Sequence, residues 1–283
     1  MKLLDYLPHY MESEVNTALN NGLEEIRIRI GQQIELLPMK ERFGKEITVE
    51  KMEEIINYLT DYSIVAYEEQ IKKGYFTIDG GYRVGVAGVV NDDGRIDINA
   101  LNIRIARQFV NCSKSLLAYI KNDNVIYNTL IVSGPGLGKT TYLRDCVRGL
   151  SFQYKVGVVD ERSEIGAMTS GVLQNDLGPG CDLMGNCGKA RGMMMLLRSM
   201  SPQIIAVDEI GEEEDYFAIN EIMKCGVKFL GTVHAANLEE VRQMKAISNL
   251  LQDKLLERIV CLELSKTNQR TFKIYNSDGM QIC

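Results

Sequence analysis

The segment GPGLGKTT combines glycines, a lysine and two threonines at the spacing that binds phosphate. It follows residues 129–133, which read as a buried strand, and precedes residues 140–150, which read as a helix. In such a turn, backbone N–H groups close around phosphate oxygens, and the positive end of the helix adds to the attraction. We expect Lys139 to reach the β- and γ-phosphates of ATP and Thr140 to bind Mg²⁺. The alternative is a glycine turn that merely links a strand to a helix, and the strand–loop–helix setting disfavours it.

The motif departs from its strict form at one position. Ser133 stands five residues before Gly138, where the strict pattern has glycine. Serine is small, so we expect a tolerated variant whose cost would be a weaker affinity for nucleotide. The expected nucleotide-binding residues are Ser133, Gly134, Pro135, Gly136, Leu137, Gly138, Lys139, Thr140 and Thr141.

A second chemical feature is an apolar run, residues 204–207, that ends in the carboxylates Asp208 and Glu209. In a phosphate-loop fold, the acid at the end of a neighbouring strand holds Mg²⁺ through water, and a further acid can orient or deprotonate the attacking water. We expect Asp208 to bind Mg²⁺ and Glu209 to act on water. Without the phosphate loop upstream, a solvated strand end would give the same letters.

Two more apolar runs end in polar groups. Residues 156–159 lead to Asp160 and Glu161, for which a role in positioning water competes with a surface cluster of salt bridges. Residues 229–233 lead to His234, which either senses the γ-phosphate or is structural. Because the carboxyl ends of parallel strands meet at one edge of a sheet, we expect these groups near the phosphate loop.

These side chains need a scaffold, and the second part of the chain has the pattern of one. In residues 111–283 short apolar strands alternate with helical stretches, which is typical of a parallel sheet with crossover helices. Residues 1–110 read instead as a smaller α+β domain. There the alternating isoleucines of residues 26–30 predict a strand, and Thr48 is placed to cap a helix.

Composition limits the class of protein. The chain has 283 residues, 45% of them hydrophobic, and a net charge of −6, which fits a globular protein and argues against one that coats nucleic acid. No apolar run approaches the roughly 20 residues that span a bilayer. The seven cysteines are scattered and odd in number, so we expect reduced thiols and a cytoplasmic location. Cys181 and Cys187 are interpreted as free thiols in a glycine-rich loop, because zinc ligands usually come as closer pairs with a second pair elsewhere.

The order of these features resembles the secretion-ATPase superfamily of type II and type IV motors. The resemblance rests on the phosphate loop, the acidic box after residue 159, the lead-in LRSMSP before the acid pair, and GTVHA around the histidine. A finer similarity, over nearly the whole chain, is to the stage III sporulation AA proteins of endospore-forming bacteria. It rests on IRIRIG, LNIRIAR, VVDERSEIGA, QNDLGP, KARGMMMLLRSMSP and VDEIG.

The resemblance implies an α/β chain with a RecA-like P-loop NTPase domain after a smaller α+β domain. It also implies a homohexameric ring that uses ATP and Mg²⁺ and acts at the cytoplasmic face of a membrane-embedded sporulation channel between mother cell and forespore. It favours the functional interpretation of Asp160, Glu161 and His234. Secretion motors commonly have Gly-Glu where this chain has Asp208-Glu209, so water positioning would differ.

Two arginines before the second domain are candidates for completing the site. Ring ATPases use arginines to stabilise charge on the γ-phosphate. Arg104 and Arg107 would point to opposite faces of a strand, so we expect only one to face the nucleotide. Ordinary surface arginines are the alternative, and Arg162 and Arg198 are further candidates.

The sequence therefore favours an ATP-hydrolysing motor with Lys139 and Glu209 at its centre. A nucleic-acid-dependent RecA-like ATPase is a second hypothesis, which stimulation by single-stranded DNA would support and which the acidic charge disfavours. A nucleotide-gated scaffold with little turnover is a third, and the intact Glu209 disfavours it.

Overall fold

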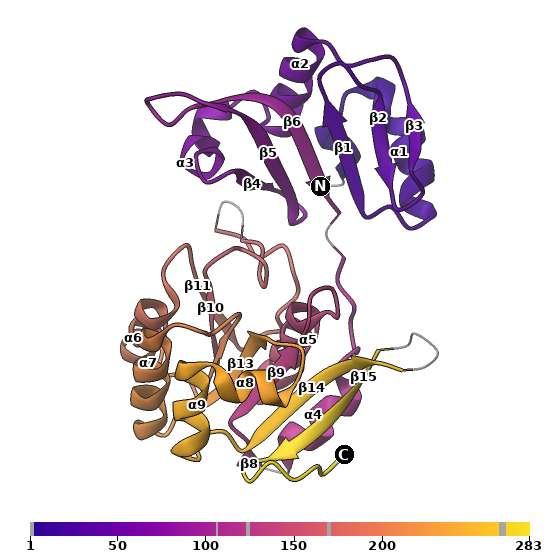
Figure 1. Cartoon of the computed structure of the whole chain (residues 1–283). Coiled ribbons are helices and arrows are strands. Elements are labelled where there is room, and N and C mark those ends of the chain that lie inside the picture. Colours follow the sequence, from indigo (N-terminus) through magenta and orange to yellow (C-terminus); the bar gives the residue numbers. More distant parts are fainter. Residues whose placement is uncertain (1–2, 106, 123–124, 169–170, 266–269) are drawn as a thin grey trace. The chain divides into compact units, whose positions relative to one another are not determined.

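The chain forms two units in the computed structural model, which describes residues 3–105, 107–122, 125–168, 171–265 and 270–283. The N-terminal unit comprises Met1–Arg107 and Ala167–Asn175, and the C-terminal unit comprises Gln108–Gly166 and Asp176–Cys283 (Figure 1). The N-terminal unit's first segment ends at Arg107, whereas the sequence analysis placed the domain boundary between residues 110 and 111. The sequence analysis contained no prediction that residues 167–175 group with the N-terminal unit.

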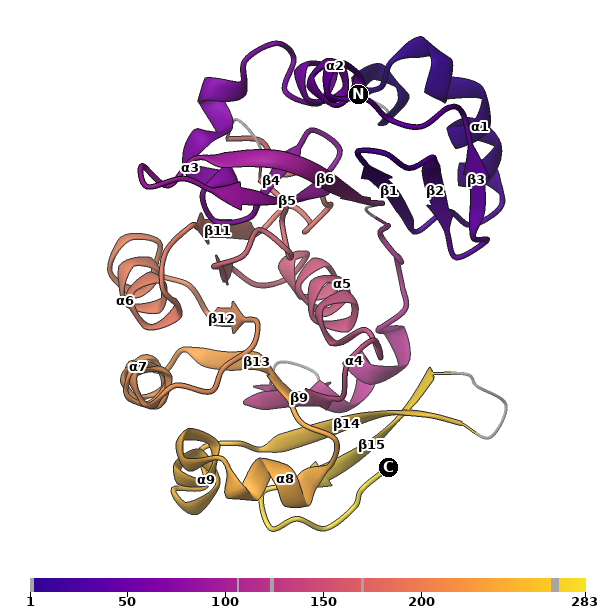
Figure 2. The same ribbon diagram turned by 45° about the horizontal axis from the view of Figure 1, so that its top comes forward.

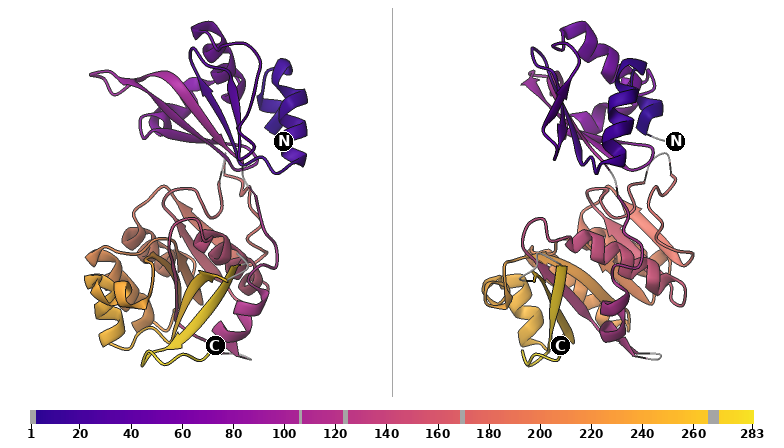
Figure 3. Two further views of the ribbon diagram at one scale, coloured as in Figure 1. Left: turned by 45° about the vertical axis from the view of Figure 1, so that its right-hand side comes forward. Right: turned by 90° about the vertical axis from the view of Figure 1, so that its right-hand side faces the viewer.

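The N-terminal unit is built on a six-stranded antiparallel sheet with strand order β3-β2-β1-β6-β5-β4. Its elements are η1 (Leu3–Tyr6), α1 (His9–Asn20), β1 (Glu25–Arg29), β2 (Ile34–Leu37), β3 (Glu41–Phe43), α2 (Val49–Leu59), η2 (Ile64–Tyr67), α3 (Glu68–Ile71), β4 (Tyr75–Ile78), β5 (Tyr82–Val90) and β6 (Ile96–Arg104). Helices α1 and α2 cover one face of this sheet (Figure 3).

The alternation in β1 explains which face is covered. Ile26 and Ile28 are fully buried, whereas Arg27 and Arg29 point to the other face and stay partly exposed. Helix α2 begins where the sequence predicts, because the Thr48 side chain accepts a hydrogen bond from the backbone N–H of Lys51 at 3.3 Å.

The C-terminal unit is built on a seven-stranded sheet with strand order β11-β10-β12-β13-β9-β14-β15. Its strands are β9 (Thr129–Ser133), β10 (Val156–Asp160), β11 (Cys181–Gly185), β12 (Ile204–Val207), β13 (Lys228–His234), β14 (Arg258–Leu264) and β15 (Arg270–Asn276). Its helices are α4 (Lys114–Ile120), α5 (Lys139–Ser151), α6 (Lys189–Ser199), α7 (Glu213–Lys224), α8 (Leu238–Gln243) and α9 (Lys245–Gln252). A short pair, β7 (Lys121–Asn122) and β8 (Val125–Ile126), lies outside the sheet. All neighbouring strands of the sheet are parallel except β14 and β15.

Helices cover both faces of this sheet, which is why its strands read as continuous apolar runs. Helix α5 lies on one face, and α6, α7 and α9 lie on the other (Figure 2). In β9, Leu130 and Val132 belong to the core on the α6, α7 and α9 side, and Ile131 between them is equally buried. The predicted α/β class is confirmed, and the predicted strands correspond to β9, β10, β12 and β13.

Two features of this unit differ from the sequence analysis. The glycine-rich segment interpreted as a loop contains β11, so Cys181 lies in an edge strand beside β10. The hairpin of β14 and β15 was not predicted. Over the described ranges, no helix is long and apolar enough to cross a membrane.

Candidate active site

The phosphate-binding motif lies between β9 and α5, as predicted. Gly136 and Gly138 have φ angles of 74° and 93°, in the left-handed region that glycine enters without steric cost. Gly138 is the N-cap of α5 and has no side chain to occupy the first-turn N–H groups. These N–H groups and the positive end of α5 therefore face the loop, which suits an anion.

Ser133, the departure from the strict motif, is buried at the end of β9. Its Oγ donates a hydrogen bond to the carbonyl of Gly134 at 2.8 Å. The hydroxyl is therefore satisfied by the loop's own backbone, which explains how the site accommodates serine.

Asp208 lies beside the phosphate loop, at the end of β12. Its Oδ2 accepts a hydrogen bond from Thr140 Oγ1 at 2.7 Å, and its Oδ1 accepts one from Thr232 Oγ1. Burial raises the pKa of Asp208, against the opposing effect of these two hydroxyls and of Lys139. The Thr140 hydroxyl and the Asp208 carboxylate are hard oxygen donors, the kind that Mg²⁺ prefers.

No cluster of three or more His, Cys, Asp and Glu side chains suited to a metal occurs within the described residues. This is compatible with Mg²⁺, which usually takes one or two protein ligands and fills its other positions with water and phosphate oxygens. The residues present thus fit Mg²⁺ bound together with a nucleotide.

Glu209 is held between two cations. Its Oε1 lies 2.6 Å from Lys139 Nζ, and its Oε2 lies 2.6 Å from Arg162 Nη1. Its φ of 55° is unusual for a non-glycine residue, and its N–H donates to Thr232 Oγ1 at 2.8 Å. Burial alone would raise the pKa of Glu209, but Lys139, Arg162 and His234 together hold it below its ordinary value. A strained backbone of this kind costs on the order of 1–3 kcal/mol and is typical of functional sites.

The acidic end of β10 contributes to the same place. Asp160, Glu161, Arg162, Glu164, Asp208 and Glu209 line one small cavity. Asp160 is buried and accepts hydrogen bonds from the backbone N–H groups of Glu164, Ile165 and Gly166 at 2.8, 3.1 and 2.8 Å. Glu161 is exposed and lies 3.3 Å from Lys189 Nζ. Asp160 therefore shapes the loop that faces Glu209, and a direct role in positioning water stays a prediction for both acids.

His234 ends β13 opposite Ser133 in the β9–β13 pairing, and its side chain is exposed. It is one of the groups that lower the pKa of Glu209. The predicted arginines lie in the N-terminal unit. Arg104 is exposed at the end of β6, and Arg107 donates from Nη2 to the carbonyl of Leu23 at 2.9 Å. Their relation to a nucleotide stays a prediction.

Two residues of the site were missed by the sequence analysis. Arg144, largely buried on α5, donates from Nε to the carbonyl of Ile165 at 2.9 Å and from Nη2 to that of Glu164. Burial lowers the pKa of its guanidinium, and Asp160 and Asp208 oppose that effect. Arg144 could have been found because it lies four positions after Thr140, on the same face of the helix. The second missed residue is Thr232, which could have been found as a hydroxyl inside an apolar strand.

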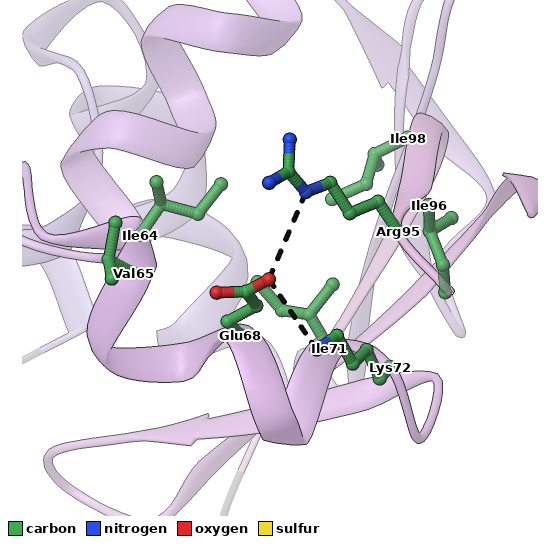
Figure 4. Close-up of a pocket in the computed structure, with 8 residues that line it drawn as sticks. All are labelled: Ile64, Val65, Glu68, Ile71, Lys72, Arg95, Ile96 and Ile98. Atoms are coloured by element: carbon green, nitrogen blue, oxygen red, sulfur yellow. Dashed lines mark ion pairs between the residues drawn. The ribbon is translucent and has the colours of Figure 1, made fainter. Parts of the chain in front are cut away.

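A separate hollow of about 340 Å³ lies in the N-terminal unit (Figure 4). Its lining consists of Ile64, Val65, Glu68, Ile71, Lys72, Arg95, Ile96 and Ile98. Glu68 faces Lys72 at 3.5 Å and Arg95 at 3.9 Å, and these cations also pair with Glu69 and Asp93. The apolar walls and paired charges offer no evident catalytic group.

The sheet order, the glycine-rich loop at the start of α5 and the acid pair after β12 define the class: a RecA-like P-loop protein. Solved structures with this fold include the ATPase DotB of Legionella pneumophila, with a TM-score of 0.65 and 16% identity over 96% of this chain and 82% of that one. The pilus retraction motor PilT with bound ADP gives a TM-score of 0.64 and 14% identity, over 97% of this chain and 82% of that one.

The family follows from the sequence comparisons. The family model described as Sporulation stage III, protein AA matches residues 11–282, and the chain belongs to this family. Stage III sporulation protein AA of Bacillus subtilis (strain 168) is 36% identical over 298 residues, which cover 98% of this chain and 95% of that protein.

Proposed function

We propose that the chain is a Mg²⁺-dependent ATPase that works as a ring of identical copies and drives a membrane-bound assembly during sporulation. The observation that carries the proposal is Glu209, paired with Lys139 of the phosphate loop beside the Thr140–Asp208 contact. The names of similar proteins support it: DotB is described as an ATPase, and PilT as a motor with bound ADP.

The phosphates of ATP would bind to the first-turn N–H groups of α5 and to Lys139. Thr140 and Asp208 would hold Mg²⁺, which when bound neutralises charge on the β- and γ-phosphates. Asp208 must be ionised for this role. Its hydrogen bonds from Thr140 and Thr232 favour the ionised form against the effect of burial.

Glu209 would supply the base. Phosphate oxygens are strong acceptors, so an incoming γ-phosphate competes with Glu209 for Lys139 and Arg162. As the cations turn toward phosphate, the pKa of Glu209 rises from its lowered value, and the carboxylate becomes a better proton acceptor. A water oxygen then attacks the γ-phosphorus, its proton passes to Glu209, and the bond to the β-phosphate oxygen breaks to give ADP and phosphate.

In a ring of identical copies, a residue of one copy would complete the site of the next. An arginine would be needed to stabilise charge on the γ-phosphate, and Arg104 is a better candidate than Arg107, whose guanidinium bonds to the Leu23 carbonyl. We assign the assembly to the cytoplasmic face of a channel between mother cell and forespore, from the family's link to stage III of sporulation.

Steady-state ATP hydrolysis as a function of protein concentration tests the proposal. The wild type is compared with Lys139→Ala and with Lys224→Ala, which removes an exposed lysine paired with Glu221 on α7. We expect specific activity to rise with concentration in the wild type and in Lys224→Ala, and to be absent in Lys139→Ala. Wild-type activity equal to that of Lys139→Ala at every concentration contradicts the proposal, and activity that appears only with single-stranded DNA supports the nucleic-acid-dependent alternative.

A further inference from the structure

Arg270 lies against the phosphate loop although it is far from it in sequence. It is the first residue of β15 and pairs with Leu264 of β14. Its Cζ and Nη1 atoms lie 3.4 Å, and its Nε 3.7 Å, from the point where a Cβ on Gly138 would stand. The guanidinium therefore lies beside the residue that caps α5, at ordinary contact distance from where a Cβ of Gly138 would be.

The strand order fixes the side from which Arg270 approaches. Strands β12 and β13 lie on one side of β9, and β14 and β15 lie on the other. Asp208 and Glu209 follow β12, so they and Arg270 flank the loop from opposite sides. The Arg270 charge also opposes the rise that burial, then Cys112, causes in the pKa of Tyr142, which places the guanidinium beside the first turn of α5.

A cation in this place is unfavourable by itself, because the N-terminus of a helix carries a partial positive charge. A bound nucleotide reverses the balance by bringing anionic phosphates to the same helix end. A guanidinium also offers a flat face that packs well on an aromatic ring, which an ammonium group does not.

We propose that Arg270 is a nucleotide-binding residue that packs its guanidinium on the base of ATP or ADP. The inference rests on the proposed function. The γ-phosphate end of the nucleotide would lie toward Asp208 and Glu209, so the base would leave the loop on the side of β14 and β15. Ligands usually occupy this crevice at the carboxyl ends of the parallel strands. Arg270 lies on that side, at the start of β15.

The inference separates binding of the base from binding of the phosphates. Isothermal titration calorimetry with Mg²⁺ measures the affinities of ADP and of inorganic pyrophosphate for the wild type and for Arg270→Ala. We expect ADP affinity to fall roughly 10-fold in the variant, in keeping with the usual effect of removing one stacking side chain. Pyrophosphate affinity is expected to fall by less, because the loop and Lys139 are intact and only the charge of Arg270 near the helix end is lost.

Two further variants sharpen the test. Arg270→Lys keeps the charge but not the flat face, so it should restore little of the ADP affinity. Lys273→Ala, on the same strand, removes a cation that pairs with Glu263 at 2.8 Å, and it should bind both ligands like the wild type. Thermal unfolding of each variant checks that the fold is retained.

The outcomes are distinct. Unchanged ADP affinity in Arg270→Ala, an equal loss for both ligands, or full recovery in Arg270→Lys would overturn the stacking role while leaving the ATPase proposal intact. If the wild type binds neither ADP nor pyrophosphate, the proposed function fails and this inference fails with it.

Discussion

Lys139 and Glu209 form an ion pair beside the phosphate loop, with Nζ 2.6 Å from Oε1. The lysine comes from the loop after β9, and the glutamate from the end of β12, two strands away in the sheet. In the proposed ATPase, Lys139 would bind the phosphates of the nucleotide and Glu209 would accept a proton from the attacking water. Nucleotide binding and activation of the base would therefore be coupled through this one contact.

Replacing Glu209 with glutamine should separate binding from hydrolysis. Glutamine keeps the shape but accepts no proton, and general bases typically contribute 10²- to 10⁴-fold to rates, so we expect turnover to fall at least roughly 100-fold. ADP affinity should be retained or improved, because Lys139 no longer pairs with a carboxylate. Turnover assays and calorimetry measure the two effects. Glu214→Gln, an exposed change on α7, is the matched control, and a Glu209→Gln chain that hydrolyses ATP at the wild-type rate would remove the glutamate from the mechanism.

The buried carboxylate of Asp208 should lower the stability of the folded protein. Since burial raises the pKa of Asp208, the folded state holds this proton more tightly than the unfolded state. The resulting cost appears as pH rises above the ordinary value near 3.9 and is complete above the raised pKa. We therefore expect Asp208→Asn to raise the free energy of unfolding by on the order of 1 kcal/mol at pH 7 without Mg²⁺, and to abolish hydrolysis.

Urea denaturation in EDTA between pH 4 and pH 8 measures this difference. The advantage of Asp208→Asn should grow as pH rises. A variant less stable than the wild type throughout this range would show that the hydrogen bonds from Thr140 and Thr232 outweigh the cost of burial.

Replacing Thr232 should reduce turnover by more than its effect on the stability of the protein suggests. Its hydroxyl accepts the N–H of Glu209 and donates to Asp208, so it fixes both acids. Thr232→Val keeps the shape but leaves these groups unpaired, and we expect a loss of about 1–3 kcal/mol in stability and roughly 10-fold or more in turnover. Thr129→Val is the matched control, because that buried threonine on β9 donates a hydrogen bond away from the site, to the carbonyl of Tyr127 at 2.7 Å. Equal turnover in the two variants would reduce Thr232 to a core residue.

The parts of the candidate site that could be predicted from the sequence are those formed by consecutive residues. The phosphate loop and the acid pair each sit at the end of an apolar run, and both faces of their strands are covered by helices, so the runs are easy to find. Strand β11 was not predicted, because it is an edge strand whose residues are all half-buried, with Asp182 and Cys181 among them. Its pattern therefore carried neither an apolar run nor an alternation.

The roles of Arg144 and Arg270 were not predicted, for a different reason. Each acts through a tertiary contact: Arg144 with the loop after β10, and Arg270 with Gly138. The residues next to either arginine in the sequence do not identify the group that it contacts in the fold. The grouping of residues 167–175 with the N-terminal unit is likewise a property of the folded chain, since Gln174 accepts a hydrogen bond from the N–H of Gly80.

Asp145 should be a major source of stability in the C-terminal unit. It is 3% exposed and accepts hydrogen bonds from the N–H of Asn111, from the N–H and Oγ of Ser113, and from Arg148 Nε. It thus fastens the first segment of this unit to α5. Burial tends to raise the pKa of Asp145, but the bonds from Ser113, with those from Asn111 and Arg148, hold it below its ordinary value.

The sign of the pH dependence follows from that lowered pKa. The folded state releases this proton more readily than the unfolded state, so Asp145 contributes stability that is full above the ordinary pKa and is lost as pH falls through the lowered one. Asp145→Asn should lower the free energy of unfolding by about 3 kcal/mol at pH 7, because an amide cannot accept all these donors and removes the charge that pairs with Arg148. Asp253→Asn, an exposed change at the end of α9, should cost less than about 0.5 kcal/mol. Urea denaturation should show that the difference in the free energy of unfolding between Asp145→Asn and the wild type becomes smaller in acid. A difference that stays constant with pH would mean that the carboxylate acts through its shape rather than its charge.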